Sequence, residues 1–303
     1  MKRIPTLLFL TIFILAIASC TTDTKPEAET FSFAFITDIH LQKEDQAPEG
    51  FRKAIADINA MQPDFVLTGG DLIMDALEEP YESADSLYDM YIEEVKGFKM
   101  PVYNSIGNHE LFGIYEVSGV SPDHAEYRYG MYEKRIGETY YSFDHKGWHF
   151  IVLNSIMDTE EREYIGMVDQ VQMKWLKADL LKVDTKTPIV ISTHIPFITV
   201  FTQILYGEYA PDYHGLVVEN ARDVLDLFAA HNLKLVLQGH LHYLEYIEIN
   251  GISFITSGAI SGHWWEGPNH DIEEGYLMVY IEGDDFCWEY VDYEWDAEKS
   301  PQP

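Results

Sequence analysis

The feature that most constrains the fold is a repeated pattern in which an apolar strand ends directly in polar residues and a helix often follows. Apolar stretches predict such strands over residues 31–37, 65–68, 102–106, 188–193 and 234–238. Each runs into Asp, His or Asn, alone or behind glycine. In sheets built this way, ligands bind beyond the carboxyl ends of the strands. Five such endings in one chain therefore predict one functional site, assembled where these strands end.

Helical and antiparallel segments complete the pattern. Apolar residues at helical spacing predict helices over residues 50–61, 83–95, 169–181 and 217–231. A hairpin is predicted from 140–144 and 148–154, and mainly antiparallel strands from 243–249, 252–256, 276–281 and 286–293. Strands alternating with helices, followed by strands alone, indicate a pair of sheets covered by helices. No Ser/Gly-rich linker divides the 303 residues, so one α/β domain is expected.

The charge balance restricts the partners. The chain has 20 basic and 51 acidic residues, which give a formal net charge of −31. Such a surface repels polyphosphate backbones, so we expect no nucleic-acid binding surface. A local site that holds divalent cations can still attract a small anionic substrate.

The N-terminus has the pattern of a targeting segment. A Met-Lys-Arg start precedes an apolar run over residues 7–18, which is shorter than the roughly 20 residues that cross a bilayer. Residues 17–20 read Ile-Ala-Ser-Cys and resemble the lipobox of bacterial lipoproteins. The resemblance implies a signal peptide over 1–19, a lipid-modified Cys20 and a tether over 20–30. The protein would then be exported to the bacterial cell envelope and anchored in the membrane, facing the periplasm or the cell surface. An ordinary signal peptide with an incidental cysteine is the alternative.

Cys287 is the only other cysteine, so the exported chain has no disulfide framework. Its neighbours Phe286 and Trp288 indicate a strand, in which a buried small apolar residue is expected.

The strand ends supply eight candidate functional side chains: Asp38, His40, Asp71, Asn108, His109, His194, His240 and His242. All offer oxygen or imidazole nitrogen and none offers a thiolate, which suits Zn, Fe or Mn rather than Cu(I) or an iron–sulfur cluster. Eight candidates exceed the needs of one ion. Two ions about 3.5–4 Å apart would use seven of them.

The order of these motifs resembles the calcineurin-like metallophosphoesterase superfamily over about residues 31–255. The motifs are D-x-H at 38–40, G-D at 70–71, G-N-H-E at 107–110, a lone histidine at 194 and G-H-x-H at 239–242. The resemblance implies a four-layer α/β/β/α sandwich over residues 31–296, with two mixed sheets flanked by helices. It also implies a dinuclear metal site at the strand ends that hydrolyses phosphate esters.

The resemblance assigns a role to each residue. The first ion, of Mn, Fe or Zn, would be held by Asp38, His40 and His242. Asp71 would bridge the ions, and the second would be completed by Asn108, His194 and His240. A metal-bridging hydroxide would be the nucleophile. His109 would face the substrate and protonate the leaving oxygen without touching metal.

The substrate class stays open between phosphodiesters or a broad range of phosphate esters and, as the alternative, phosphomonoesters. No basic clamp for a doubly charged phosphoryl group accompanies the motifs, and the nearest basic residues are Arg52, Lys53 and Arg128. This favours diesters. The alternative from another class is a catalytically inactive surface binding lipoprotein of the same fold.

One position departs from the family pattern. Many members have an aspartate three residues after the bridging one, often tied to the catalytic histidine, whereas this chain has Met74 there and Asp75 one later. The carboxylate that orients His109 is therefore Asp75, Glu110 or a more distant residue. Met74 also stands where purple acid phosphatases place a tyrosinate iron ligand, so a purple enzyme is not expected.

Three long loops could form the walls of the site. Residues 257–276 contain Trp264 and Trp265, which either pack under the loop or stack on the substrate. Residues 197–215 could form the other wall, and residues 111–139 an insertion or cap.

Overall fold

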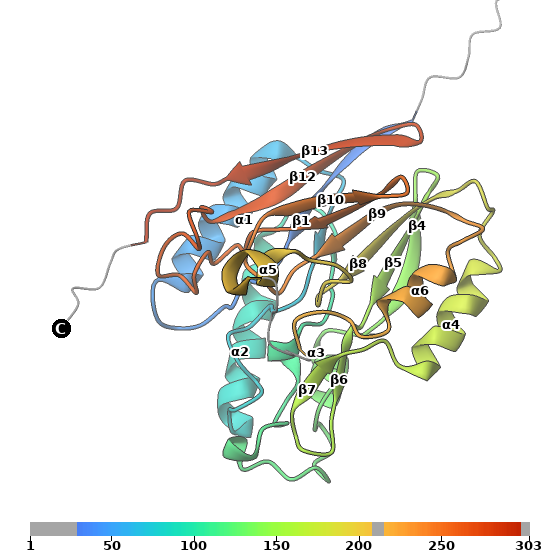
Figure 1. Ribbon diagram of the computed structural model, residues 1–303. Helices are drawn as coiled ribbons and strands as arrows, with labels where there is room; N and C mark the ends of the chain where they lie inside the picture. Colours follow the sequence, from blue (N-terminus) through green and yellow to red (C-terminus); the bar gives the residue numbers. More distant parts are fainter. Residues whose placement is uncertain (1–28, 208–214, 298–303) are drawn as a thin grey trace, which may run out of the picture.

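The computed structural model describes residues 29–207 and 215–297, which form two mixed sheets (Figure 1). The first sheet has the order β13–β12–β1–β2–β3, with β1 Thr30–Ile36, β2 Phe65–Thr68, β3 Val102–Tyr103, β12 Gly275–Glu282 and β13 Asp285–Asp292. The second has the order β10–β11–β9–β8–β5–β4, with β4 Tyr141–His145, β5 Trp148–Leu153, β8 Pro188–Thr193, β9 Asn232–Gln238, β10 Glu245–Ile249 and β11 Ile252–Thr256. In the first sheet β1, β2 and β3 run parallel, and β12 is antiparallel to both β1 and β13. In the second sheet β11, β9, β8 and β5 run parallel, and the edge strands β10 and β4 are antiparallel to their neighbours.

The side chains of β1 show why the sheets have two covered faces. Phe33 and Phe35 belong to the core between the sheets, together with Phe150 and Leu235 of the second sheet. The intervening Ala34 belongs to the other core, on the helix side. Because successive side chains of a strand point to opposite faces, an apolar run such as Phe33–Ile36 needs cover on both sides.

Helices supply the two outer layers. α1 (Ala47–Met61) and α2 (Tyr81–Glu94) lie beside the first sheet, and α4 (Gln170–Leu180) and α6 (Ala221–Asp226) lie beside the second (Figure 1). The buried residues of these helices join the helix-side core, among them Phe51, Tyr88, Leu176 and Val224. The four-layer sandwich expected from the motif order is therefore confirmed.

Two predicted elements are shorter than expected. The strand over 102–106 stops at Tyr103, because the Ser105 N–H donates to the Thr68 hydroxyl at 2.8 Å rather than to a strand carbonyl. The helix over 217–231 is reduced to α6. The N–H groups of Val218 and Glu219 donate to carbonyls of other segments, so the backbone there is not free to be helical.

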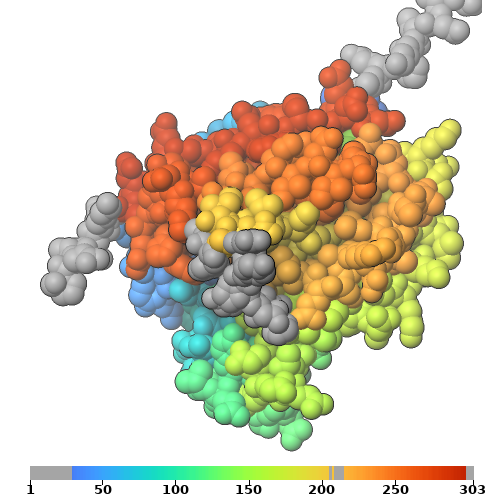
Figure 2. All heavy atoms as spheres, in the orientation of Figure 1, coloured from blue at the N-terminus to red at the C-terminus, as the bar shows by residue number. Residues whose placement is uncertain are grey.

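The remaining elements are short: β6 (Ile156–Asp158), β7 (Tyr164–Gly166), α3 (Gly130–Arg135), α5 (Phe201–Tyr206) and the 3₁₀ turns Val95–Gly97, Asn108–Glu110 and Glu116–Ser118. β6 and β7 form a separate hairpin that the sequence analysis missed, because three residues are too few to show a periodicity. Figure 2 shows α5, in yellow, at the surface against the orange-red C-terminal segments.

Cys287 is exposed, so the expectation that it is buried was wrong. It lies on β13, an edge strand of the first sheet, in which Asp285, Cys287 and Glu289 are exposed and alternate with half-buried residues.

The predicted signal peptide, Cys20 and most of the tether lie outside the described residues. Within residues 29–207 and 215–297, no helix has the length and apolar character needed to cross a membrane.

Candidate metal centre

The centre is built where strands of both sheets end. Asp38 follows β1 and Asp71 follows β2 of the first sheet, while His194 follows β8 and His240 follows β9 of the second. Asn108 and His109 lie in the 3₁₀ turn after β3. The fold therefore brings together residues that are up to 204 positions apart, from Asp38 to His242, and all eight predicted side chains lie at or beside one centre.

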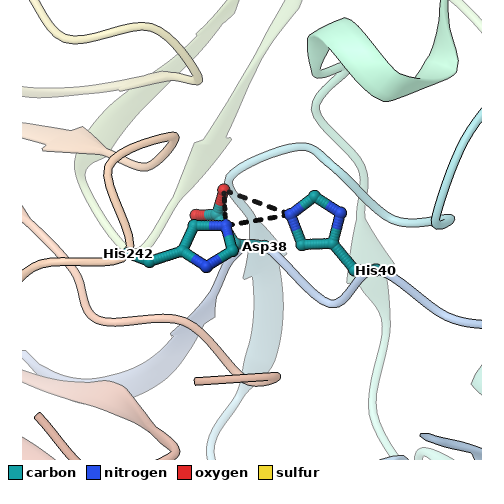
Figure 3. Close-up of side chains that lie close together, drawn as sticks. All are labelled: Asp38, His40 and His242. Atoms are coloured by element: carbon teal, nitrogen blue, oxygen red, sulfur yellow. Dashed lines mark hydrogen bonds and ion pairs between the residues drawn. The ribbon is translucent and has the colours of Figure 1, made fainter. Parts of the chain in front are cut away.

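Asp38, His40 and His242 form the first ligand group (Figure 3). The Nε2 atoms of His40 and His242 lie 2.9 Å apart, and the Asp38 Oδ1 lies 3.4 Å from the His242 Nε2. Figure 3 shows the carboxylate and both rings directed toward one point. Three donor atoms within 4.8 Å of one another can share one cation.

Asp71, His194 and His240 form the second group. The Asp71 Oδ2 lies 3.1 Å from the His194 Nε2, and the His240 Nδ1 lies 3.3 Å from the same nitrogen. The Asn108 Oδ1 is 3.0 Å from the His194 Nε2 and adds a neutral oxygen. The Asp71 Oδ2 is also 3.6 Å from the His40 Nε2 of the first group, so this carboxylate lies between the two groups.

Backbone carbonyls fix the imidazole tautomers. The Nδ1 of His194 is 2.8 Å from the Gly69 carbonyl, and the Nδ1 of His242 is 2.7 Å from the Gly262 carbonyl. A carbonyl only accepts, so each Nδ1 carries a proton and each Nε2 is the ring nitrogen that faces the centre. This is the nitrogen that a divalent metal ion would bind.

Five of the seven expected ligands have a left-handed backbone: Asp38, His40, Asp71, His240 and His242 have φ between 46° and 72°. Non-glycine residues in that region are uncommon, and such strained positions concentrate at functional sites. These turns direct several side chains toward one point. The left-handed backbone that this requires costs conformational free energy.

Both carboxylates are ionised. Burial raises the pKa of Asp38, but the imidazoles of His242 and His194 outweigh it and hold that pKa at about 2. Burial likewise opposes ionisation of Asp71, yet the neighbouring histidines, His194 foremost, hold its pKa well below the usual value. Two buried carboxylates in their charged form need cations close to them.

The histidines differ in charge. Burial lowers the pKa of His240 to about 4, with His194 acting in the same direction. Burial also lowers the pKa of His40, so both imidazoles are neutral and available as ligands. Burial would lower the pKa of His194 too, but Asp71 raises it to about 9. His194 therefore holds an extra proton beside Asp71, and a metal ion bound at this position would replace that proton.

The sequence as a whole matches a family with this kind of site. Residues 31–244 match the family model of the calcineurin-like phosphoesterases. The chain belongs to this family. Members of it hydrolyse phosphate esters, which agrees with the function expected from the order of the motifs.

Several relatives have phosphoesterase names. A probable cyclic nucleotide phosphodiesterase of Synechococcus is 26% identical over 85% of this chain and 90% of its own length. Another from Xenorhabdus bovienii is 21% identical over 70% of this chain and 74% of its own. Purple acid phosphatase 22 of Arabidopsis thaliana is 28% identical over 73% of this chain but only 46% of its own length.

Solved structures share the fold. A dimetal phosphatase from Danio rerio has a TM-score of 0.61 and 17% identity, covering 87% of this chain and 96% of its own. GAP50, described as the anchor in the inner membrane complex of Plasmodium, has a TM-score of 0.56 and 17% identity, covering 88% and 85%. The fold thus occurs both in a phosphatase and in a protein described as an anchor, so function has to be argued from the site.

His109 lies beside the centre, and a backbone carbonyl orients it. Its Nε2 is 3.9 Å from the Asp71 Oδ2, and its ring is 4.6 Å from that of His40. Its Nδ1 makes a short contact to the Met74 carbonyl, so Nδ1 carries the proton. The position that departs from the family pattern therefore orients His109 through its main chain. Asp75 accepts hydrogen bonds from the N–H groups of residues 77 and 78.

Glu110, whose role the sequence left unsettled, joins the two metal-binding loops of the first sheet. Its carboxylate is fully buried and accepts four backbone N–H groups, from Asp71, Leu72, Ile73 and Gly107, at 2.7–3.1 Å. It therefore fixes the loop of Asp71 against the turn of Asn108 and His109. Glu110 is a positioning residue for the ligands.

The two tryptophans of residues 257–276 have different environments. Trp265 is buried, and its indole N–H donates to the carbonyls of Ile39 and His40. Its expected contact with substrate is therefore corrected to a packing role. Trp264 is 38% exposed, and its ring centroid is 5.0 Å from that of His242.

Sequence reasoning missed Tyr164, whose ring is 6.4 Å from that of His240. It lies on β7, a strand that was itself missed, so no sequence signal pointed to it. The carbonyls of Gly69, Met74 and Gly262 were missed because a main-chain acceptor leaves no residue-type signature.

Proposed function

We propose that this chain is an active phosphoesterase that depends on two metal ions and hydrolyses phosphodiesters or a broad range of phosphate esters. The observation that supports the proposal is the pair of ligand groups on either side of Asp71, whose Oδ2 lies 3.1 Å from the His194 Nε2 and 3.6 Å from the His40 Nε2. A binding protein that had lost activity would be expected to lack some of these side chains, and every expected ligand is present.

The two groups would hold different ions. Asp38, His40 and His242 would hold one, Asn108, His194 and His240 the other, and Asp71 would contact both. Nitrogen and oxygen donors without thiolate suit Mn, Fe or Zn. Such ions, when bound, supply Lewis acidity toward phosphate oxygens and lower the pKa of water at the site.

His109 would act on the leaving oxygen. The water oxygen forms a bond to phosphorus while the bond from phosphorus to the departing ester oxygen breaks. His109 would act in its doubly protonated form: the Nε2 proton passes to that oxygen while the Nδ1 proton stays on the ring. The proton lost by water restores the imidazolium, so a diester and water give a monoester and an alcohol. The Met74 carbonyl keeps the Nδ1 proton in place and directs Nε2 toward the centre.

The surroundings of the three basic side chains that lie nearest to the motifs in the sequence favour diesters over monoesters. Arg52 pairs with Glu94, Lys53 donates to the Tyr293 carbonyl, and the Arg128 Nε lies 2.7 Å from an Asp158 oxygen. These three cations are thus engaged elsewhere. A diester has one negative charge at the phosphate, whereas a monoester has up to two and gains more from added cations. The names of the Synechococcus and Xenorhabdus relatives point the same way.

The test is hydrolysis of bis(p-nitrophenyl) phosphate and of p-nitrophenyl phosphate by metal-stripped protein to which Mn, Zn or Fe is added. We expect metal-dependent turnover, with the diester preferred. Preference for the monoester would overturn the substrate assignment, and no turnover with any metal would support the binding-protein alternative.

The role of His109 needs a variant. His109→Ala should keep its bound metal and lose rate by roughly 10²–10⁴-fold on esters with poor leaving groups. The matched control is His124→Ala, which removes an exposed histidine outside the centre and should leave the rate unchanged. If His109→Ala loses its metal, His109 is a ligand and its assigned role is wrong.

We also propose that Cys20 is lipid-modified and anchors the exported protein in a bacterial envelope membrane. The lipobox-like sequence before Cys20 and the Met-Lys-Arg start support this. Cys20→Ala should move the protein from the membrane to the soluble fraction, and membrane retention of the variant would refute the anchor.

A further inference from the structure

Trp264 presents a partly exposed aromatic ring beside the first ligand group. Its ring centroid lies 5.0 Å from that of His242 and 6.1 Å from that of His40. The ring is 38% exposed, whereas both histidines are almost fully buried. A group attached to a phosphate at this centre would therefore meet the indole before it met solvent.

The segment that contains Trp264 is fixed to the ligands. The Gly262 carbonyl accepts from the His242 Nδ1, and the Ser261 hydroxyl donates to the Asp38 carbonyl at 2.8 Å. On the other side of Trp264, the buried Trp265 donates to the carbonyl of His40. A ring held between anchors on both sides is pre-organised, which recognition surfaces need.

The backbone of residues 264 and 265 has an uncommon conformation. Trp264 has φ +48° and Trp265 has φ +70°, both in the left-handed region that bulky residues rarely adopt. This conformation lets one indole enter the core while its neighbour stays at the surface. Strain of this kind marks candidate functional segments.

We propose that Trp264 stacks on an aromatic group of the ester arm that stays on phosphorus. The inference rests on the proposed function, in which the leaving arm lies at His109. His109 packs against the ring of His40, whereas Trp264 lies nearer to the ring of His242, so the arm that Trp264 meets is the one away from His109. Stacking on an indole selects aryl or nucleobase groups, because a π-face interacts well with another π-face.

Two substrates with the same leaving group test the proposal. Bis(p-nitrophenyl) phosphate and methyl p-nitrophenyl phosphate both release p-nitrophenolate and differ in the retained arm. The protein should prefer the aryl diester in kcat/KM, and Trp264→Ala should reduce that preference by about five- to tenfold. Trp264→Phe should retain most of it. Glu266→Gln, an exposed change on the same loop, should not alter it.

Binding without turnover gives an independent readout. Phenylphosphonate should bind the metal-loaded protein more tightly than methylphosphonate in calorimetric titration, and Trp264→Ala should remove most of that difference. If Trp264→Ala leaves the ratio of kcat/KM for the two diesters unchanged, Trp264 does not have the proposed role, and the phosphoesterase proposal still stands. No turnover of either diester by the unaltered protein would instead refute the proposed function.

Discussion

Two buried glutamates of this protein, Glu110 and Glu274, have nearly the same exposure and opposite surroundings. Glu110 is 0% and Glu274 is 1% exposed. Burial raises both pKa values, with Asp71 adding to the shift of Glu110, which reaches about 8, and Glu273 to that of Glu274, which reaches about 7. Glu110 nevertheless accepts four backbone N–H groups. Neither oxygen of Glu274 has a hydrogen-bond partner in another residue of the described part of the chain.

The two side chains therefore have different roles. Glu110 holds backbone segments of the site together, whereas Glu274 is buried without such bonds and destabilises the fold when it is charged. The N–H groups that reach Glu110 come from two loops, so this side chain converts separate strand ends into one rigid ligand platform. Glu274 lies near Glu273, Asp292 and Asp296, all of which disfavour its charge. A buried acid without donors is cheapest when protonated.

The largest effect is expected from Glu110→Ala. The variant leaves four buried N–H groups without their acceptor, and each unsatisfied donor costs about 1–3 kcal/mol. The free energy of unfolding should fall by roughly 4 kcal/mol or more in urea titrations of metal-free protein. Metal affinity should also fall by about 10–100-fold, because the ligand loops lose their common support.

Glu274→Ala is the matched control, because it removes a buried carboxyl group of the same kind without breaking hydrogen bonds to backbone N–H groups. If both alanine variants lost equal stability and bound metal equally well, Glu110 would not have the positioning role assigned to it.

A pH-dependent gain is expected from Glu274→Gln. The pKa of Glu274 is about 7 in the folded protein against 4.5 in the unfolded chain, so the folded state resists ionisation. Stability is therefore full below pH 4.5 and is lost as pH rises toward 7. The variant should be more stable than the unaltered protein by about 2–3 kcal/mol at pH 8 and nearly equal at pH 4.5.

Urea unfolding at the two pH values measures this gain. Glu110→Gln serves as the control at the lower pH. Its amide cannot accept all four N–H groups, so it should destabilise the protein at pH 4.5, where Glu274→Gln should have almost no effect. A Glu274→Gln variant that loses stability at pH 8 would show that the carboxylate has a favourable partner.

The smallest effects are expected from removing two tyrosine hydroxyl groups that donate to backbone carbonyls near the two glutamates. The Tyr88 hydroxyl donates to the Glu110 carbonyl at 2.7 Å, and the Tyr293 hydroxyl donates to the Ile260 carbonyl at 2.6 Å. Tyr88→Phe and Tyr293→Phe should each lower the free energy of unfolding by about 1 kcal/mol. A much larger loss for Tyr88→Phe alone would mean that the phenol, and not the carboxylate, holds the platform.

Much of the site was readable from the sequence because its chemistry depends on residue type. Asp, Asn and His at strand ends have no role in an apolar core, and five such endings in a fixed order indicated both the fold and the ligands. The succession of strands and helices along the chain was also predicted, since hydrophobic alternation and helix periodicity are local properties. The central strands, which are apolar on both faces, were predicted within one or two residues. The early end of β3, which lies at an edge of the first sheet, was not predicted.

Elements stabilised by distant contacts were predicted less well. β3 ends early because the Thr68 hydroxyl, 37 positions from Ser105, takes the Ser105 N–H. Cys287 is exposed because β13 is an edge strand, and the position of a strand within a sheet is not a property of its own residues.

The sequence by itself determined the set of candidate ligands, the order of the motifs and the layered fold, because side-chain chemistry and periodicity are properties of the chain. Only the tertiary structure decided how the ligands are oriented. The Met74 carbonyl beside His109, the four N–H groups around Glu110 and the separation of Trp264 from Trp265 all depend on main-chain groups brought together by folding. Every residue has those groups, so no pattern of residue types can predict which of them will meet.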